Sequence, residues 1–193
     1  MSKNGKGGEI DGFIRELQTL AEDSLKVFGS LKPAQLNWKP SAEQWSVGQC
    51  FDHLITTNRC FFPSFTRVAA GRHQNSLWQR ASPLSGFFAR FILGALDPEK
   101  GRSIKAPRVF RPTASDVEPG VIVKFTRNLS EACGLMRATE TAGVDLRGTI
   151  VTSPVSPLVT YSLLDAYRIM VAHGRKHFEQ ARRVTEVPGF PAA

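Results

Sequence analysis

The stretch TYSLLDAYRIMVAHGRKHFEQARRV, residues 160–184, decides the fold class of this chain. Apolar side chains recur in it every three or four positions, which is the spacing of an amphipathic α-helix. The positions of this apolar line are Leu164, Tyr167, Met170, Val171, Gly174, Phe178 and Ala181. The sequence therefore predicts one long helix from about Thr160 to Val184.

Residues 10–30 repeat the same spacing, and Gly29 and then Pro33 close the segment. Its apolar positions are Ile10, Phe13, Ile14, Leu17, Leu20, Ala21, Leu25 and Phe28. The pattern predicts a second long helix, which is followed by a connector over residues 31–44.

A third helix is predicted from its own start signal. Ser46 can cap it, and Gln49 three residues later completes a capping box. Trp45, just before the cap, is placed to staple onto Cys50. The apolar spacing then continues until Gly71, where the helix is expected to end.

One more helix, the third in chain order, is predicted to begin near Ser115. Glu118 completes another capping box there, and Pro119 is tolerated in the first turn. Residues 141–157 are then expected to form a loop, in which residues 148–152 are a candidate short extended piece.

Residues 71–113 are the least regular part of the chain. Within them, residues 84–96 are predicted to form a short helix and residues 100–112 an extended, basic loop. The short helix could be a lid over a site, a membrane-touching amphipathic segment, or an insertion that packs on the other helices. We favour packing, because short apolar helices usually belong to the core.

Four amphipathic helices without a convincing alternating strand predict an all-α protein with a four-helix bundle. The chain has 193 residues, of which 41% are hydrophobic and 22% charged, a balance that suits one domain with one core. We therefore expect a single domain over residues 1–193, with a long irregular insertion between the second and third helices of the bundle.

Several classes of protein are excluded by composition. The polar, glycine-rich start of the chain predicts no signal peptide, and residues 84–96 are shorter than the roughly 20 residues that a membrane-spanning helix needs. Cys50, Cys60 and Cys133 match no disulfide framework or zinc pattern, which favours reduced thiols in a cytoplasm. We expect a soluble cytoplasmic protein without a membrane partner.

The formal net charge is +8, with basic clusters in residues 100–111 and 175–183. Such a field could attract an anionic ligand or a nucleic acid. No RNA-binding aromatic motif, helix-turn-helix spacing or basic zipper accompanies the charge. We therefore interpret it as a solvated surface and expect no nucleic-acid partner.

The placement of the four histidines is informative. His173 and His177 are four residues apart in the predicted last helix, so both imidazoles project from one face, about 6 Å apart at Cβ. Helical histidine pairs of this kind can close on one metal ion. His53 lies on the edge of another apolar stripe, and bundles build metal sites from inward side chains on facing helices. The alternative is that hydrogen bonds satisfy the buried rings; a shared metal is favoured because unpartnered buried imidazoles cost free energy.

Three stretches resemble signatures of the DinB-like (YfiT-like) superfamily of metal-dependent enzymes. They are Leu36-Asn-Trp-Lys-Pro40, Gln44-Trp-Ser-Val-Gly-Gln-Cys-Phe-Asp-His-Leu54 and Ala172-His-Gly-Arg-Lys-His-Phe-Glu-Gln180. The resemblance covers nearly the whole chain and is weakest over residues 71–113.

The resemblance implies that His53, His173 and His177 hold one divalent ion, such as Zn²⁺ or Ni²⁺. It also implies a four-helix bundle with down-up-up-down connectivity, and homodimers are common among similar proteins. Gly174 departs from the commoner pattern and costs about 1 kcal/mol relative to alanine within a helix. We expect it to mark a close helix crossing.

Three protein ligands leave at least one position open on a metal, as in catalytic sites. Hydrolysis normally also needs a carboxylate base, but Asp52 points about 100° away from His53 around the helix, and Glu179 is displaced from His177. The resemblance implies transferases that use low-molecular-weight thiols, which a metal can ionise directly. We therefore rank metal-dependent thiol transfer slightly above hydrolysis of a small molecule. The rival is a non-catalytic metal- or ligand-binding module.

Four further residues are candidates for the functional site. Gln49 and Gln180, each one turn from a histidine, could contact metal-bound water or orient a substrate, or could be ordinary surface glutamines. Cys50 could approach the metal as a fourth ligand, but we favour a small buried hydrophobe. His73 is expected at the surface of a polar loop.

Overall fold

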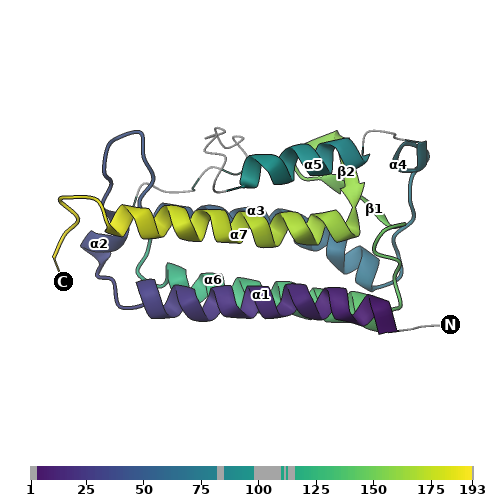
Figure 1. The fold of residues 1–193 in the computed structure, drawn as a ribbon, viewed down its shortest axis with the longest axis horizontal. Helices are drawn as coiled ribbons and strands as arrows, with labels where there is room; N and C mark the ends of the chain where they lie inside the picture. Colours follow the sequence, from purple (N-terminus) through teal and green to yellow (C-terminus); the bar gives the residue numbers. More distant parts are fainter. Residues whose placement is uncertain (1–3, 82–84, 98–109, 111, 113–115, 193) are drawn as a thin grey trace.

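Four long helices form the main body of the described part of the protein (Figure 1). They are α1 (Asn4–Phe28), α3 (Val47–Ala69), α6 (Val121–Thr141) and α7 (Leu163–Thr185). Both α1 and α3 pack against α6 and against α7, so each long helix has two long neighbours. The computed structural model describes residues 4–81, 85–97, 110, 112 and 116–192. The mostly helical prediction is confirmed, whereas the down-up-up-down connectivity stays a prediction.

Smaller elements surround the long helices. They are α2 (Pro33–Asn37), α4 (Leu77–Ala81), α5 (Ser85–Leu96), and the antiparallel strands β1 (Ile150–Ser153) and β2 (Ser156–Ser162). In Figure 1, α5 and the two strands lie together along one side of α7, and α5 packs against both α7 and β2. This agrees with the expectation that the short apolar helix packs on the rest of the protein. None of the helices in the described ranges combines the length and the apolar composition that a membrane crossing requires.

The start of α3 follows the prediction. The Ser46 hydroxyl accepts a hydrogen bond from the Gln49 backbone N–H at 3.2 Å, and the Gln49 side-chain oxygen accepts one from the Ser46 N–H at 3.3 Å. The helix ends at Ala69, and Gly71 adopts a positive φ of 67° just beyond it. Glycine adopts this left-handed conformation without a Cβ clash, which is why the helix stops there.

The predicted start of α6 near Ser115 is wrong. The helix begins at Val121, its N-cap is Gly120, and no side chain caps it. The reason lies in another part of the chain: the Asn37 side chain accepts a hydrogen bond from the Val117 N–H at 2.8 Å and donates one to the Val117 carbonyl at 3.0 Å. These two bonds hold the backbone at Val117 against α2, so it does not join the helix. Ser115 itself lies outside the described residues.

The strand pair is a second correction. Only a short extended piece over residues 148–152 was expected, and the last helix was expected to begin near Thr160. Instead, Thr160 and Tyr161 belong to β2 and pair with β1, and α7 begins at Leu163 after its N-cap Ser162. Apolar residues keep the helical spacing through these positions. Packing of the buried Tyr161 against its cross-strand partners nevertheless stabilises the strand more than the helix here.

The first helix is longer than predicted, because it begins at Asn4 rather than Ile10. The glycines at positions 5, 7 and 8 interrupt the apolar spacing without ending the helix. The predicted basic loop over residues 100–112 lies outside the described residues, apart from Phe110 and Pro112.

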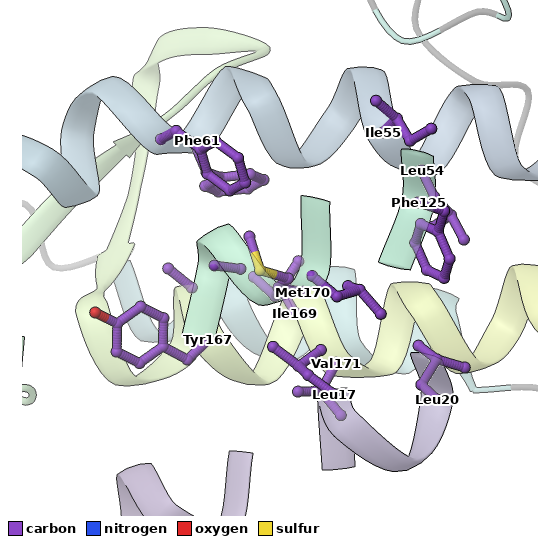
Figure 2. Close-up of a cluster of buried hydrophobic side chains, with 14 of the residues drawn as sticks. Leu17, Leu20, Leu54, Ile55, Phe61, Phe125, Tyr167, Ile169, Met170 and Val171 are labelled. Carbon is purple, nitrogen blue, oxygen red and sulfur yellow. The ribbon is translucent and has the colours of Figure 1, made fainter. Parts of the chain in front are cut away.

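The core lies between the long helices. Figure 2 shows Leu17 and Leu20 of α1 facing side chains of α7 such as Val171. The expected close crossing at Gly174 is confirmed, since a Cβ on this residue would lie only 2.6 Å from the Leu20 Cδ2 atom. The absence of a side chain at Gly174 therefore lets α1 approach the helix that carries His173 and His177.

Candidate metal centre

Three imidazole rings meet where α3 faces α7. His53 of α3 is 2% exposed, His177 of α7 is 9% exposed, and His173 is half-buried. The ring centroids lie 4.9 Å apart for His53 and His173, and 4.6 Å apart for each of the other two pairs. One ring nitrogen from each histidine lies within 4.8 Å of the others. The structure therefore brings together the three residues that the sequence proposed as ligands.

The nitrogen positions suit a shared ion. Bonds from zinc to imidazole are about 2.0–2.1 Å long, so two nitrogens on one ion lie within roughly 4.2 Å of each other. The Nε2 atoms of His53 and His173 are already 3.0 Å apart. The buried Nδ1 atom of His177 has no hydrogen-bond partner among the described residues, although buried polar atoms are normally paired. Small side-chain rotations would let all three rings bind one ion.

The electrostatic environment keeps the rings neutral. Burial lowers the pKa of His53, and a backbone hydrogen bond to Phe110 and the charge of Asp52 only partly oppose it. Burial and the neighbouring His177, His53 and Lys176 hold the pKa of His173 well below its usual range. Neutral imidazole is the form that binds a metal, so the cluster is ready to act as a ligand set at neutral pH.

Burial lowers the pKa of His177 as well, so this ring is also neutral. Burial first, and then the neighbouring His53, lower its pKa from 6.5 to about 3, while a hydrogen bond with Gln180 opposes this shift. The contact with Gln180 leaves Nδ1 unsatisfied. Gln180 therefore contacts a predicted ligand, and its suggested role toward a bound substrate stays a prediction.

Gln49 has a structural role at the start of α3. Its side-chain oxygen accepts the capping-box hydrogen bond described above, and the residue is buried. It is therefore not an ordinary surface glutamine. Contact of its amide with a molecule bound at the site stays a prediction.

Trp45 lies against the cluster, although the sequence favoured a core or staple position for it over a place at a ligand site. Its ring centroid is 4.8 Å from that of His53, and it stacks on His177 at 5.7 Å with an interplanar angle of 25°. Its place just before the cap of α3 gave only the signal of a hydrophobic staple. Trp45 shields two of the three imidazoles on the side that it covers.

The other two candidates lie outside the cluster. Burial raises the pKa of the Cys50 thiol to about 12, which disfavours the thiolate that a metal would bind. The structure thus supports the interpretation of Cys50 as a small buried hydrophobe. His73 is half-buried rather than fully at the surface, and its ring contacts the Ile150 carbonyl of β1 at 2.9 Å. It helps to attach the loop before α4 to the strand pair.

Two charged side chains of α7 near the site form ion pairs with other residues. Glu179 forms an ion pair with Arg182 at 2.9 Å, and Arg175 pairs with Glu16 at 2.9 Å. Among the described residues, the group that could hold a metal contains no carboxylate. Asp52 lies near enough to His53 for its charge to act on the ring, and the absence of a general base beside the ligands stays a prediction.

Thr57 is a buried residue that the sequence analysis did not single out. It lies one turn along α3 from His53, so the two side chains share a face of the helix. Thr57 is 5% exposed, and its hydroxyl has no hydrogen-bond partner in the described part of the chain. An unpartnered buried hydroxyl destabilises the fold.

Replacing Thr57 by valine is expected to raise the free energy of unfolding by about 1 kcal/mol, because the change removes an unsatisfied polar group and keeps the shape. In a protein of this size that corresponds to roughly 2–4 °C in Tm, which calorimetry can measure. The matched control is Thr139→Val, since the Thr139 hydroxyl accepts from Tyr167 and donates to the Leu135 carbonyl. The control should lose stability; equal losses in both variants would show that Thr57 is hydrogen-bonded.

Comparison with known families agrees with this geometry. The sequence model of a family described as the DinB superfamily matches residues 16–181, a range that contains all three histidines. No curated protein and no solved structure matches the chain.

Proposed function

The chain belongs to the DinB superfamily, and from that premise we propose that it is a metalloprotein that binds one divalent ion, Zn²⁺ or Ni²⁺, through His53, His173 and His177. One observation carries the proposal: three neutral imidazoles from two helices lie with a nitrogen of each within 4.8 Å of the others. Hydrogen bonds alone do not satisfy this arrangement, since the buried Nδ1 of His177 is unpartnered among the described residues.

We propose that the protein is a metal-dependent transferase that uses a low-molecular-weight thiol, with hydrolysis of a small molecule as the second choice. An ion held by three histidines keeps a position open and supplies the Lewis acidity that ionises a coordinated thiol or water. The three histidines hold the site and remain unprotonated, and Trp45 shields the rings of His53 and His177. The ligand group holds no carboxylate among the described residues, which favours thiol transfer, because a thiol needs no separate base there.

The competing proposal is a metal- or ligand-binding module without catalytic activity. The same lack of a carboxylate within the described ligand group supports it, since no residue is assigned to move a proton.

An activity assay separates these proposals. The purified protein, loaded with Zn²⁺ or Ni²⁺, is incubated with bacillithiol, mycothiol or glutathione and an electrophile, and loss of free thiol is followed. We expect metal-dependent consumption of at least one thiol, which the His173→Ala variant should lose and the His73→Ala variant should retain. A protein that binds metal but consumes none of the thiols would favour the non-catalytic module.

A further inference from the structure

We propose that the main-chain carbonyl of Phe110 is a positioning group for the metal centre, because it holds the His53 ring with its proton on Nδ1 and leaves Nε2 to bind the ion. The inference rests on the proposed metal site, since a bound ion is what gives this tautomer a function.

The contact at Nδ1 assigns the proton. The Nδ1 atom of His53 forms a buried hydrogen bond with the Phe110 carbonyl oxygen. A carbonyl can only accept, so Nδ1 must carry the hydrogen. A neutral imidazole has one N–H, and the lone pair is therefore on Nε2. The opposite tautomer would place a lone pair of Nδ1 against the carbonyl oxygen.

The contact at Nε2 is compatible with this assignment but does not by itself decide it. The Nε2 atoms of His53 and His173 lie 3.0 Å apart. This distance is attractive only if one nitrogen donates to the other. With the His53 proton on Nδ1, His173 is the donor and the lone pair of His53 faces the second ligand, where a shared ion would lie.

The buried side chain of Phe110 can hold the main-chain carbonyl of the same residue in position. Its side chain is only 9% exposed, so burial of the ring anchors the backbone at this position. Metal-binding histidines commonly donate their other N–H to a carbonyl or carboxylate, which sets the ring orientation. Here the carbonyl comes from a residue 57 positions beyond His53, near the end of the insertion.

A second contact ties the insertion to the other ligand helix. The Lys176 ammonium group, next to His177 in the sequence, donates a hydrogen bond of 2.7 Å to the Ala95 carbonyl near the end of α5. The positive charge of Lys176 also interacts favourably with the helix dipole at the C-terminal end of α5. The insertion therefore contacts the ligand-bearing helices α3 and α7 at separate points.

The tautomer can be measured without metal. In ¹⁵N-labelled, chelator-treated protein, long-range ¹H–¹⁵N correlation spectra distinguish a protonated ring nitrogen from an unprotonated one. We expect His53 to be protonated at Nδ1 in the wild-type protein and to show mixed tautomers in Phe110→Ala. Phe110→Leu keeps an apolar anchor and should restore the wild-type pattern.

Metal affinity is the second readout. Chelator competition should show a loss of about 10- to 100-fold in Phe110→Ala, the range for removal of an outer-shell partner, and a much smaller loss in Phe110→Leu. The matched control is Phe62→Ala, because Phe62 is 7% exposed and lies about 13 Å along α3 from His53. The control should lose stability and keep the His53 tautomer.

Two results would overturn the inference. One is protonation of His53 at Nε2 in the metal-free wild-type protein, which is decisive even if the variants do not fold. The other is an equal loss of affinity in Phe110→Ala and Phe62→Ala. A wild-type protein that shows the expected tautomer but binds no divalent ion would instead refute the proposed function.

Discussion

Replacing His173 by alanine is expected to reduce the bound divalent metal from about one ion per chain to a trace. His173 supplies one of three nitrogens within 4.8 Å of one another. Without it, only two histidines remain to bind the ion, one fewer than the three protein ligands of a typical catalytic zinc site. The loss of affinity should exceed the roughly 10- to 100-fold that removal of an outer-shell partner costs. Elemental analysis and chelator competition on the purified variant measure both quantities.

His73→Ala is the matched control for this change. It also removes a histidine, but this ring contacts the Ile150 carbonyl rather than the cluster. The control should keep its metal. Undiminished metal content in His173→Ala would remove the ligand assignment, and with it the proposed chemistry.

Acidification is expected to destabilise the metal-free protein. Burial lowers the pKa of His177 from 6.5 to about 3. Between these two pH values, the histidine is mostly protonated in the unfolded chain and mostly neutral in the folded chain. Stability is therefore lost as the pH falls below 6.5, and the loss continues down to the folded pKa. His177 alone accounts for about 2 kcal/mol between pH 7.5 and pH 5. The lowered pKa values of His53 and His173 act in the same direction.

Urea unfolding in the presence of a chelator, repeated across this pH range, measures the loss. In His177→Gln the decrease in stability should be smaller by about 2 kcal/mol, because one of the coupled groups is gone. Parallel curves for the wild-type protein and the variant would contradict the buried, neutral state of this histidine.

The two outcomes together test whether the buried histidines form a metal site, and the choice between enzyme and module rests on the activity assay. Burying neutral histidines without a metal costs free energy, because their polar nitrogens lose contact with water. Apolar residues of similar size would fill an ordinary core without that cost. The Thr57 hydroxyl, one turn along α3 from His53, is another buried polar group without a hydrogen-bond partner among the described residues.

Much of the fold could be predicted because its signals are local. The apolar spacing of residues 160–184, the capping box at Ser46 and the end of α3 at Gly71 each depend on residues within a few turns of one another. The pairing of His173 with His177 is equally local, since helix geometry places residues four apart on one face.

Other features depend on contacts between distant parts of the chain. Asn37 holds the backbone at Val117 and so delays the start of α6, and the pairing of β1 with β2 takes Thr160 and Tyr161 out of the last helix. A local pattern does not contain these partners. Both helices therefore begin later in the chain than their local pattern predicts.

By itself, then, the sequence determined the four long helical segments, the histidine pair and, through a family resemblance, the third candidate ligand. Only the tertiary structure decided that the rings meet within reach of one ion, that Trp45 covers two of them, and that the Phe110 carbonyl assigns the proton of His53. The physical reason is that spacing along a helix sets the direction of a side chain. The distance to another helix, the burial that lowers a pKa and the backbone group that accepts a proton all arise when remote segments pack together.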